Sequence, residues 1–288
     1  MKNWMFALAV AVAGVLVVTI ARAEERYFSG APRYESAAAR QIVERMIAAH
    51  GGLEPWEGID TMSFRFVTKV VGAPSPQPPF YSVETSNLNT GQVIIDWPWF
   101  NAETVWNGEE AWSRNWPIPP LPTGFFTKLT SSFITLPWLT QTDGVTIGAP
   151  TKGRLPEKAQ DDKDYDVVRM TFDNPNPSIP GEFYDIFIDP DTHLMRAVRF
   201  NITHPAMVRI AGQPVGPNVH VFSEYHDVNG LKIPAYYYTY GGGAAAGPAV
   251  DALHIVFGLQ MNAPFDENRL AAPEDARQDE ETVAWWAQ

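Results

Sequence analysis

The chain has 288 residues, contains no cysteine and carries a formal net charge of −12. The lack of cysteine excludes disulfide bonds, catalytic thiolates and cysteine-based metal sites, and the acidic surface disfavours nucleic acid and anionic lipid headgroups as partners. The length suffices for one large β domain or two smaller domains, and the 25 prolines favour strands with irregular loops over long helices.

The first 23 residues have the pattern of a secretory signal peptide. Lys2 gives a positive start, Trp4 to Ile20 is uncharged and apolar, and Ala21-Arg22-Ala23 is an A-x-A cleavage site. An uncleaved membrane anchor is the alternative, because the apolar stretch approaches the length of a membrane span. We expect cleavage after Ala23 and a soluble, exported protein in a bacterial periplasm.

A helix is predicted from Ser36 to His50. Ile42, Met46 and Ala49 share one stripe, and Gly51-Gly52 provides the stop. A meander of strands is then predicted over residues 61–71, 80–89, 92–97, 103–106 and 109–113.

The segment from Phe125 to Leu139 has apolar residues at helical spacing and interrupts the strands. Its Ser and Thr content and Pro137 predict a short or broken helix, which we interpret as a lid or plug. Strands resume over residues 145–151, 165–172, 182–189, 193–203 and 252–261. We expect one domain over residues 24–265 and an acidic tail over 266–288 that is partly disordered or docked only by Trp285-Trp286.

Residues 219–240 are predicted to form two strands joined by Asn229-Gly230, a pair that favours a two-residue type I′ turn. This turn places Phe222 opposite Tyr237 and puts Tyr225 on the other face. Both faces are then apolar, whereas a hairpin with water on one side alternates apolar and polar residues. We therefore expect apolar cover on both faces.

Aromatic residues gather around the proline-rich segment 117–122 and the predicted lid. Ordinary core is one interpretation, since aromatic side chains dominate protein cores. The interpretation that the doubly apolar strands favour is a ligand pocket between the sheet and the lid, with indole N–H groups as polar contacts. The residues assigned to this pocket are Trp97, Trp99, Phe100, Trp106, Trp112, Trp116, Phe125, Phe126, Leu129, Phe133, Leu136 and Trp138.

The histidines give weak signals for chemistry. His220, Glu224 and His226 alternate onto one strand face, but the two histidines are about 20 Å apart along it. A metal ion would therefore need ligands from elsewhere. His50, at the end of the predicted helix, is expected to be structural, at a position where the helix dipole favours an imidazolium.

The acidic loops are read as turns, with calcium binding as the alternative. They are Asp189-Pro190-Asp191 and the run Asp161–Asp164. No G-x-S-x-G, H-E-x-x-H, phosphate-loop or dinucleotide fingerprint occurs. We predict no catalytic residue, no metal and no cofactor.

Two local patterns carry a resemblance to a known family. Ala39 to Trp56 reads A-x-x-I-V-x-x-M-I-x-A-H-G-G-x-x-x-W, and Phe222 to Pro234 reads F-x-x-Y-x-x-V-N-G-L-K-I-P. With the order helix, strand meander, aromatic helical insert and further strands, residues 36–265 resemble the outer-membrane lipoprotein-sorting proteins of the LolA superfamily. No binding residue of that family is carried over to a position of this chain.

The resemblance implies a mainly β (α+β) fold. A strongly curved antiparallel sheet or unclosed β-barrel would wrap around the N-terminal helix and the central helical insert. It further implies a hydrophobic concavity that shields an acyl chain.

The function predicted from these features is that of a periplasmic carrier or sensor. It would bind a hydrophobic ligand, a lipid or a lipoprotein acyl chain, as in lipoprotein sorting and outer-membrane biogenesis. One alternative is an exported hydrolase or metal-dependent enzyme using His226, Glu224 and Asp227 at a sheet edge. Another is a docking module whose partner is an inner- or outer-membrane envelope protein.

Overall fold

The fold is given by a computed structural model that describes residues 30–71, 79–116, 123–159, 161–173, 183–203, 208, 215–241 and 251–278. The side chains of Phe125, Phe126 and Leu129 fall outside the described part of the chain. The predicted signal peptide and the predicted docking of Trp285-Trp286 also lie outside it.

Strands dominate the described residues and form two runs, one before and one after a helical segment. The first run is β2 (Thr61–Val71), β3 (Phe80–Asn87), β4 (Val93–Trp97), β5 (Ala102–Trp106) and β6 (Ala111–Arg114). The second run is β7 (Val145–Ile147), β8 (Thr151–Gly153), β9 (Tyr165–Phe172), β10 (Phe183–Ile188), β11 (Met195–Ile202), β12 (Val215–Val228), β13 (Leu231–Tyr240) and β14 (Asp251–Met261). Two short strands, β1 (Arg33–Tyr34) and β15 (Arg277–Gln278), complete the set.

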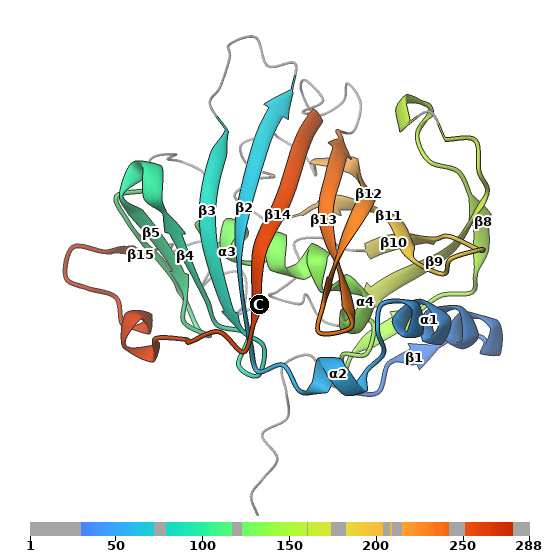
Figure 1. Ribbon diagram of the computed structural model, residues 1–288, viewed down its shortest axis with the longest axis horizontal. Coiled ribbons are helices and arrows are strands. Elements are labelled where there is room, and N and C mark those ends of the chain that lie inside the picture. The colour runs from blue at the N-terminus through green and yellow to red at the C-terminus, as the bar shows by residue number, and fades with distance from the viewer. Residues whose placement is uncertain are drawn as a thin grey trace, which may run out of the picture.

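These strands join one curved sheet that does not close (Figure 1). Its order is β1-β7-β9-β10-β11-β12-β13-β14-β2-β3-β4-β5-β6-β15, with β8 beside β9. Because β14 pairs with β2, the second run continues directly into the first, and β1 and β15 remain separate edges. The predicted mainly β fold with an unclosed barrel is confirmed.

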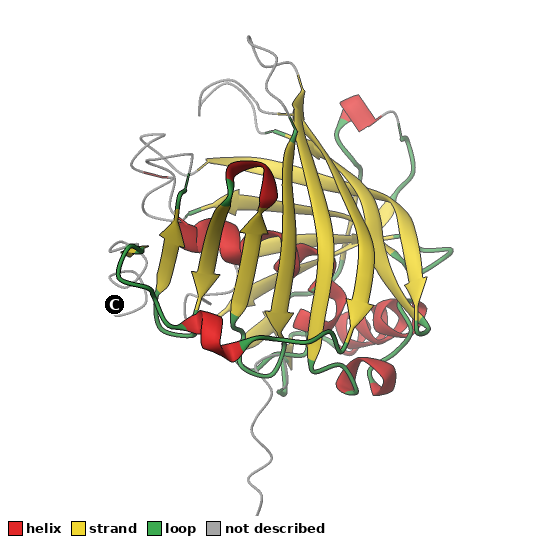
Figure 2. Ribbon diagram, turned by 60° about the vertical axis from the view of Figure 1, so that its left-hand side comes forward, coloured by secondary structure: helices red, strands yellow, loops and turns green. Residues whose placement is uncertain are grey.

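The sheet bends around helical segments, as Figure 2 shows. They are α1 (Ala37–Ala49), α2 (Glu54–Glu57), α3 (Thr123–Ile134) and α4 (Leu136–Leu139), with 3-10 turns η1 (Pro98–Phe100), η2 (Glu157–Ala159) and η3 (Glu267–Leu270). The Ser36 side chain caps α1 by accepting from the Ala39 N–H, and Gly51 follows the helix with a positive φ of 107°. The predicted helical insert is broken at Thr135, next to a second helix that carries Pro137 in its first turn.

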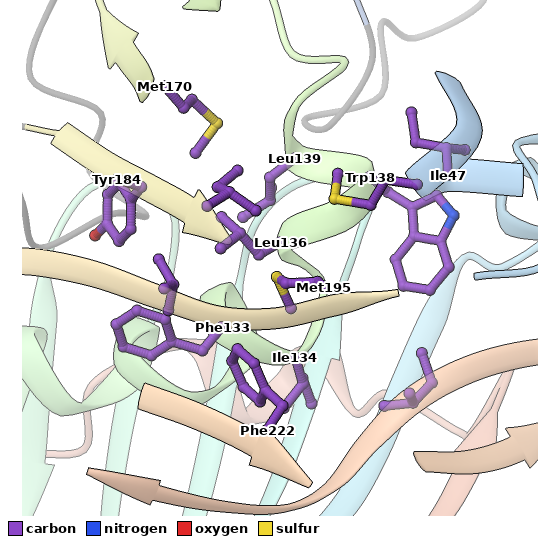
Figure 3. Packing of buried hydrophobic residues seen from close by; sticks show 14 of the residues in the cluster. Ile47, Phe133, Ile134, Leu136, Trp138, Leu139, Met170, Tyr184, Met195 and Phe222 are labelled. Carbon is purple, nitrogen blue, oxygen red and sulfur yellow. The ribbon is translucent and has the colours of Figure 1, made fainter. Parts of the chain in front are cut away.

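The main core lies between the concave face of the sheet and the helices (Figure 3). Ile47 of α1, Phe133 of α3 and Trp138 of α4 meet there with strand residues such as Tyr184 and Phe222, and all are nearly inaccessible to water. Burial of large apolar side chains from every layer supplies the driving force that holds the sheet around the helices.

The β12–β13 hairpin has the predicted turn and the predicted pairing of Phe222 with Tyr237. The placement of Tyr225 on the other face was wrong. Register shifts on both sides of Glu224 turn Tyr225 toward the main core, where its ring meets His50 edge-on at 5.3 Å. The expected apolar cover on the outer face is present beside β12, where Val221 packs in a second cluster with Leu155.

The acidic tail also differs from expectation over residues 266–278. These residues dock through η3 and through β15, which pairs with β6, rather than only through the terminal indoles. Arg269 of η3 reaches Asp96 and Glu103 on the outer face of the sheet. We call the ion pairs of Arg269 with Asp96 and Glu103 the clasp. Ion pairs leave no hydrophobic pattern in the sequence, so the clasp was not predicted.

Candidate functional site

Four of the predicted pocket aromatics meet on the concave face of the β4–β6 wall. Trp97, Phe100, Trp106 and Trp116 belong to, or pack against, one apolar cluster there. The α3 helix lies against the same three strands. The indole N–H of Trp97 donates to the hydroxyl of Thr104 at 3.1 Å, so its polar atom is used within the wall.

Three other predicted residues lie in the main core, where the helical insert is anchored. The Phe133 ring is 4.6 Å from Phe200 and 4.3 Å from His220, measured between centroids. Leu136 is buried, and Trp138 donates to the carbonyl of Gly52 at 2.9 Å. The helical insert is therefore fixed at its C-terminal end by packing against α1 and the sheet.

Two predicted residues are not brought into the interior. Trp112 lies on the outer face of the wall beneath the tail, and its indole donates to the carbonyl of Leu270 at 3.0 Å. Trp99 on η1 is 58% exposed and leans on Tyr81. Alternation along a strand sends neighbouring residues to opposite faces, which explains why the whole aromatic cluster does not face one pocket.

Buried polar side chains occur both on α3 and on the strands that face it, and the sequence interpretation missed them. Thr123, Thr127, Thr130 and Ser131 are buried and recur at the spacing of one helix stripe. The strands β3, β5 and β6 present buried Ser82, Glu84, Ser86, Thr104 and Ser113. We call these residues the hydroxyl seam. Ser82, Glu84 and Ser86 alternate along β3, which is the sequence signal that could have revealed polar residues facing inward.

Glu84 is the ionisable residue of the hydroxyl seam. Its carboxyl group is 2% exposed, accepts a hydrogen bond from the Ser82 hydroxyl at 3.0 Å and also interacts with the Thr130 hydroxyl. Burial raises the pKa of Glu84 to about 8, with the two hydroxyls opposing that shift. The carboxyl group is therefore mostly protonated at neutral pH.

A chain of buried polar groups continues across the concave face. The Thr239 hydroxyl lies 2.7 Å from both His220 Nδ1 and His254 Nε2, and Thr68 lies 3.0 Å from His254 Nδ1. A hydroxyl has one proton, so Thr239 donates to one imidazole and accepts from the other. Burial lowers the pKa of His254 to about 3 and that of His220 well below its usual value, so both rings are neutral.

His50 is also neutral, contrary to the expected imidazolium. Its Nε2 accepts from the Met195 N–H at 3.1 Å, so its Nδ1 carries the proton and donates to the Lys232 carbonyl at 2.8 Å. Burial lowers the pKa of His50 to about 4. Desolvation outweighs the helix dipole here because the ring lies inside the core, between α1 and two strands.

No protein-family model and no curated protein matches this sequence. Solved structures do match. A LolA superfamily protein from Nitrosomonas europaea aligns over 82% of this chain and 98% of its own, with a TM-score of 0.53 and 9% identity. A DUF1329 family protein from Desulfovibrio piger aligns over the same shares, with a TM-score of 0.51 and 9% identity.

The chain has a LolA-like fold. The resemblance seen in the helix and hairpin patterns is thereby confirmed at the level of the fold. Among the described residues, no helix combines the length and the apolar character needed to cross a membrane.

Within this LolA-like fold, the residues of the enzyme alternative do not converge. His226 donates to the Val256 carbonyl at 2.8 Å, Asp227 pairs with Lys232 at the hairpin turn, and Glu224 is exposed. In the described ranges, no group of three or more His, Asp or Glu residues could hold a metal ion.

The two acidic turns are joined by ion pairs of Lys163, which belongs to the run Asp161–Asp164. The Lys163 ammonium donates to Asp189 at 2.9 Å and to Asp191 at 2.6 Å. These carboxylates therefore act as partners of a side-chain cation.

A polar pocket of about 480 Å³ lies outside the half-barrel, between the wall and the tail. It is lined by the ion pairs of Arg269 and Arg114 with Asp96 and Glu103. Because the opposite charges are already paired with one another, we interpret this pocket as the place where the tail packs against the wall, and not as a ligand site.

Proposed function

We propose that this protein is an exported, periplasmic carrier or sensor that binds the hydrophobic part of a ligand inside the half-barrel. The ligand class is a lipid or an acyl chain. A carrier of this type receives and delivers its cargo at membranes, so inner- or outer-membrane envelope proteins are the proposed partners.

The position of α3 is the observation that carries this proposal. The helix fills the concavity of an unclosed sheet, with an apolar aromatic wall on one side and the main core at its end. Its described buried side chains from Thr123 to Ser132 bear hydroxyls, which can hydrogen-bond to water when the helix lifts. Displacing it would uncover Trp97 and Trp106 for a ligand.

Burial of the ligand supplies free energy for such an exchange. Burial of an acyl chain contributes about 0.8 kcal/mol for each CH₂ group. A chain of about twelve carbons therefore offers roughly 9 kcal/mol toward the cost of separating α3 from the sheet.

Native mass spectrometry tests this function directly. The protein, purified gently after export, is expected to release a bound apolar molecule into solvent on denaturation. A mass without ligand, together with no thermal stabilisation by added lipids or apolar dyes, would contradict the proposal.

A matched pair of variants tests the location. Trp106→Ala removes an indole from the concave face, and Trp112→Ala removes one from the outer face of the same wall. Both indoles are buried, so both variants lose stability, by about 3–5 kcal/mol. After correction for the folded fraction, Trp106→Ala is expected to weaken binding of the apolar dye N-phenyl-1-naphthylamine, and Trp112→Ala is not. Equal effects would place the ligand elsewhere.

A further inference from the structure

Glu84 is buried in the hydroxyl seam without a full set of hydrogen-bond partners. It stands on β3 between Phe64 of β2 and Ile95 of β4, so apolar neighbours flank it in the sheet. Among the described residues its Oε2 has no hydrogen-bond partner. A buried polar atom left unpaired is costly, and native structures keep few of them.

Two hydroxyls of the hydroxyl seam are likewise buried without a hydrogen-bond partner in the described part of the chain. Ser86, on the same strand face, and Thr123, on the same stripe of α3 as Thr130, are buried with no partner among the described residues. Ser86 follows Glu84 by two residues, so both side chains point to the concave side. Within the described ranges, unpaired polar oxygens thus occur both on α3 and on the strand that carries Glu84.

We infer that the hydroxyl seam is a subsite for the polar head of an amphiphilic ligand, and that this head donates an N–H or O–H group to Glu84. The subsite rests on the proposed binding function and adds the chemistry of the cargo. A cationic amine is the best match, because it supplies several donors and pairs with the carboxylate. An anionic head is disfavoured, because the seam offers no cation to pair with its buried charge.

Movement of α3 would open this subsite. Thr130 now interacts with the carboxyl group from the helix side, so lifting α3 removes that hydroxyl and lets a ligand donor replace it. The apolar tail of the ligand would then lie along the neighbouring aromatic cluster with Trp97 and Trp106, on the same concave face. Head and tail would both contact the wall that α3 vacates.

Three ligands of equal chain length test the head-group preference. Dodecylamine, 1-dodecanol and dodecanoic acid, each below its aggregation limit, compete at pH 7.5 with N-phenyl-1-naphthylamine for the wild-type protein. We expect the amine to bind at least roughly tenfold more tightly than the alcohol, as a charge-assisted hydrogen bond allows, and the acid to bind most weakly.

Glu84→Gln is expected to remove most of the advantage of the amine over the alcohol while leaving alcohol affinity within about twofold. Glu224→Gln is the matched control, since it makes the same change at an exposed position, and it should keep the wild-type order. Equal affinities for amine and alcohol in the wild type, or an unchanged order in Glu84→Gln, would overturn the subsite while leaving the binding function intact. Failure of the wild type to take up the dye or any of the three ligands would overturn both.

Infrared difference spectra of the wild type test the same subsite if Glu84→Gln does not fold. Dodecylamine is expected to convert a protonated carboxyl band into a carboxylate band, because the ammonium stabilises the charged form of Glu84. Dodecanol, which is neutral, is expected to leave the protonated band in place. A band that survives the amine would overturn the pairing.

Discussion

At the scale of the residue, His50 shows how one buried side chain joins three elements. It follows α1 directly, accepts from β11 at Met195 and donates to β13 at Lys232. Both bonds are to backbone groups beside an apolar core, where an unpaired group costs about 1–3 kcal/mol.

The neutral state of His50 makes stability depend on pH. Its pKa of about 4 in the folded protein lies below the usual 6.5, so between these values only the unfolded chain takes up the proton. Stability is therefore lost as pH falls from about 6.5 to 4, by about 3 kcal/mol from this residue. His220 and His254, whose pKa values are also lowered, act in the same direction.

Urea unfolding at pH 7 and pH 5 measures this dependence. His50→Asn is expected to lose about 2–3 kcal/mol at pH 7 and to show a smaller further loss at pH 5 than the wild type. His193→Asn is the control, because His193 has a positive φ of 60° that Asn tolerates. Because Glu84 acts in the opposite direction, the comparison is repeated with Glu84→Gln as the parent protein. A stability of this parent that rises on acidification through this range would contradict the assignment.

Glu84 makes the stability depend on pH in the opposite direction to His50. Its pKa is raised from 4.5 to about 8, so the folded protein holds a proton that the unfolded chain releases between these values. Burial of this group therefore costs stability increasingly as pH rises from 4.5 to 8. We expect Glu84→Gln to stabilise the protein by about 3 kcal/mol more at pH 8 than at pH 5, measured by urea unfolding. Glu224→Gln should show no such difference, and a pH-independent effect at Glu84 would refute the buried, protonated state.

At the scale of the element, the helical insert is anchored at one end and carries buried hydroxyls among the other side chains that the structure describes. Phe133, which was assigned to the predicted pocket, belongs to the anchored end: its side chain is fully buried beside Phe200 and His220. Phe133→Asp would bury a charge in the core and unfold the protein rather than report ligand retention.

Engineered thiols separate movement of α3 from unfolding, since the chain has no cysteine of its own. Thr127 in α3 and Thr140 after α4 are both fully buried, and each hydroxyl donates to a carbonyl three residues earlier. We expect Thr127→Cys to react with a thiol reagent at least roughly tenfold faster than Thr140→Cys, because local opening is less costly than global unfolding. Equal labelling rates would mean that α3 opens only when the whole molecule unfolds.

At the scale of the whole molecule, the tail fastens the free edge of the half-barrel. Arg269 bonds Glu103, whose side chain is 9% exposed, and Asp96, while β15 extends the sheet beyond β6. The tail also covers the outer cluster of Ile94, Val105 and Trp112. One edge of the open sheet is thereby protected from pairing with other chains.

Removal of this clasp should cost more than removal of an ordinary surface ion pair. Arg269→Ala is expected to destabilise the protein by about 1–2 kcal/mol, because it leaves a buried carboxylate with fewer partners. Arg154→Ala breaks a pair whose side chains are 62% and 59% exposed and should change stability by less than about 0.5 kcal/mol. Thermal unfolding measures both, and equal losses would show that the clasp adds nothing.

The sequence by itself determined the elements and the fold class. The Ser36 cap, the glycines after α1 and the Asn229-Gly230 turn act through local backbone geometry, and strand alternation acts through local side-chain direction. Such rules need no knowledge of distant residues, and they were enough to predict the broken helix and the meander, whereas the unclosed sheet was implied by the resemblance to the LolA superfamily.

Only the tertiary structure decided which side chains share a site. Two compensating register shifts turned Tyr225 inward, the tail covered Trp112 from outside, and α3 brought hydroxyls against Glu84. Each of these depends on contacts between residues far apart in the chain, and neither composition nor periodicity encodes them. Burial also set the protonation of Glu84 and His50, because desolvation acts only once the surrounding elements have packed.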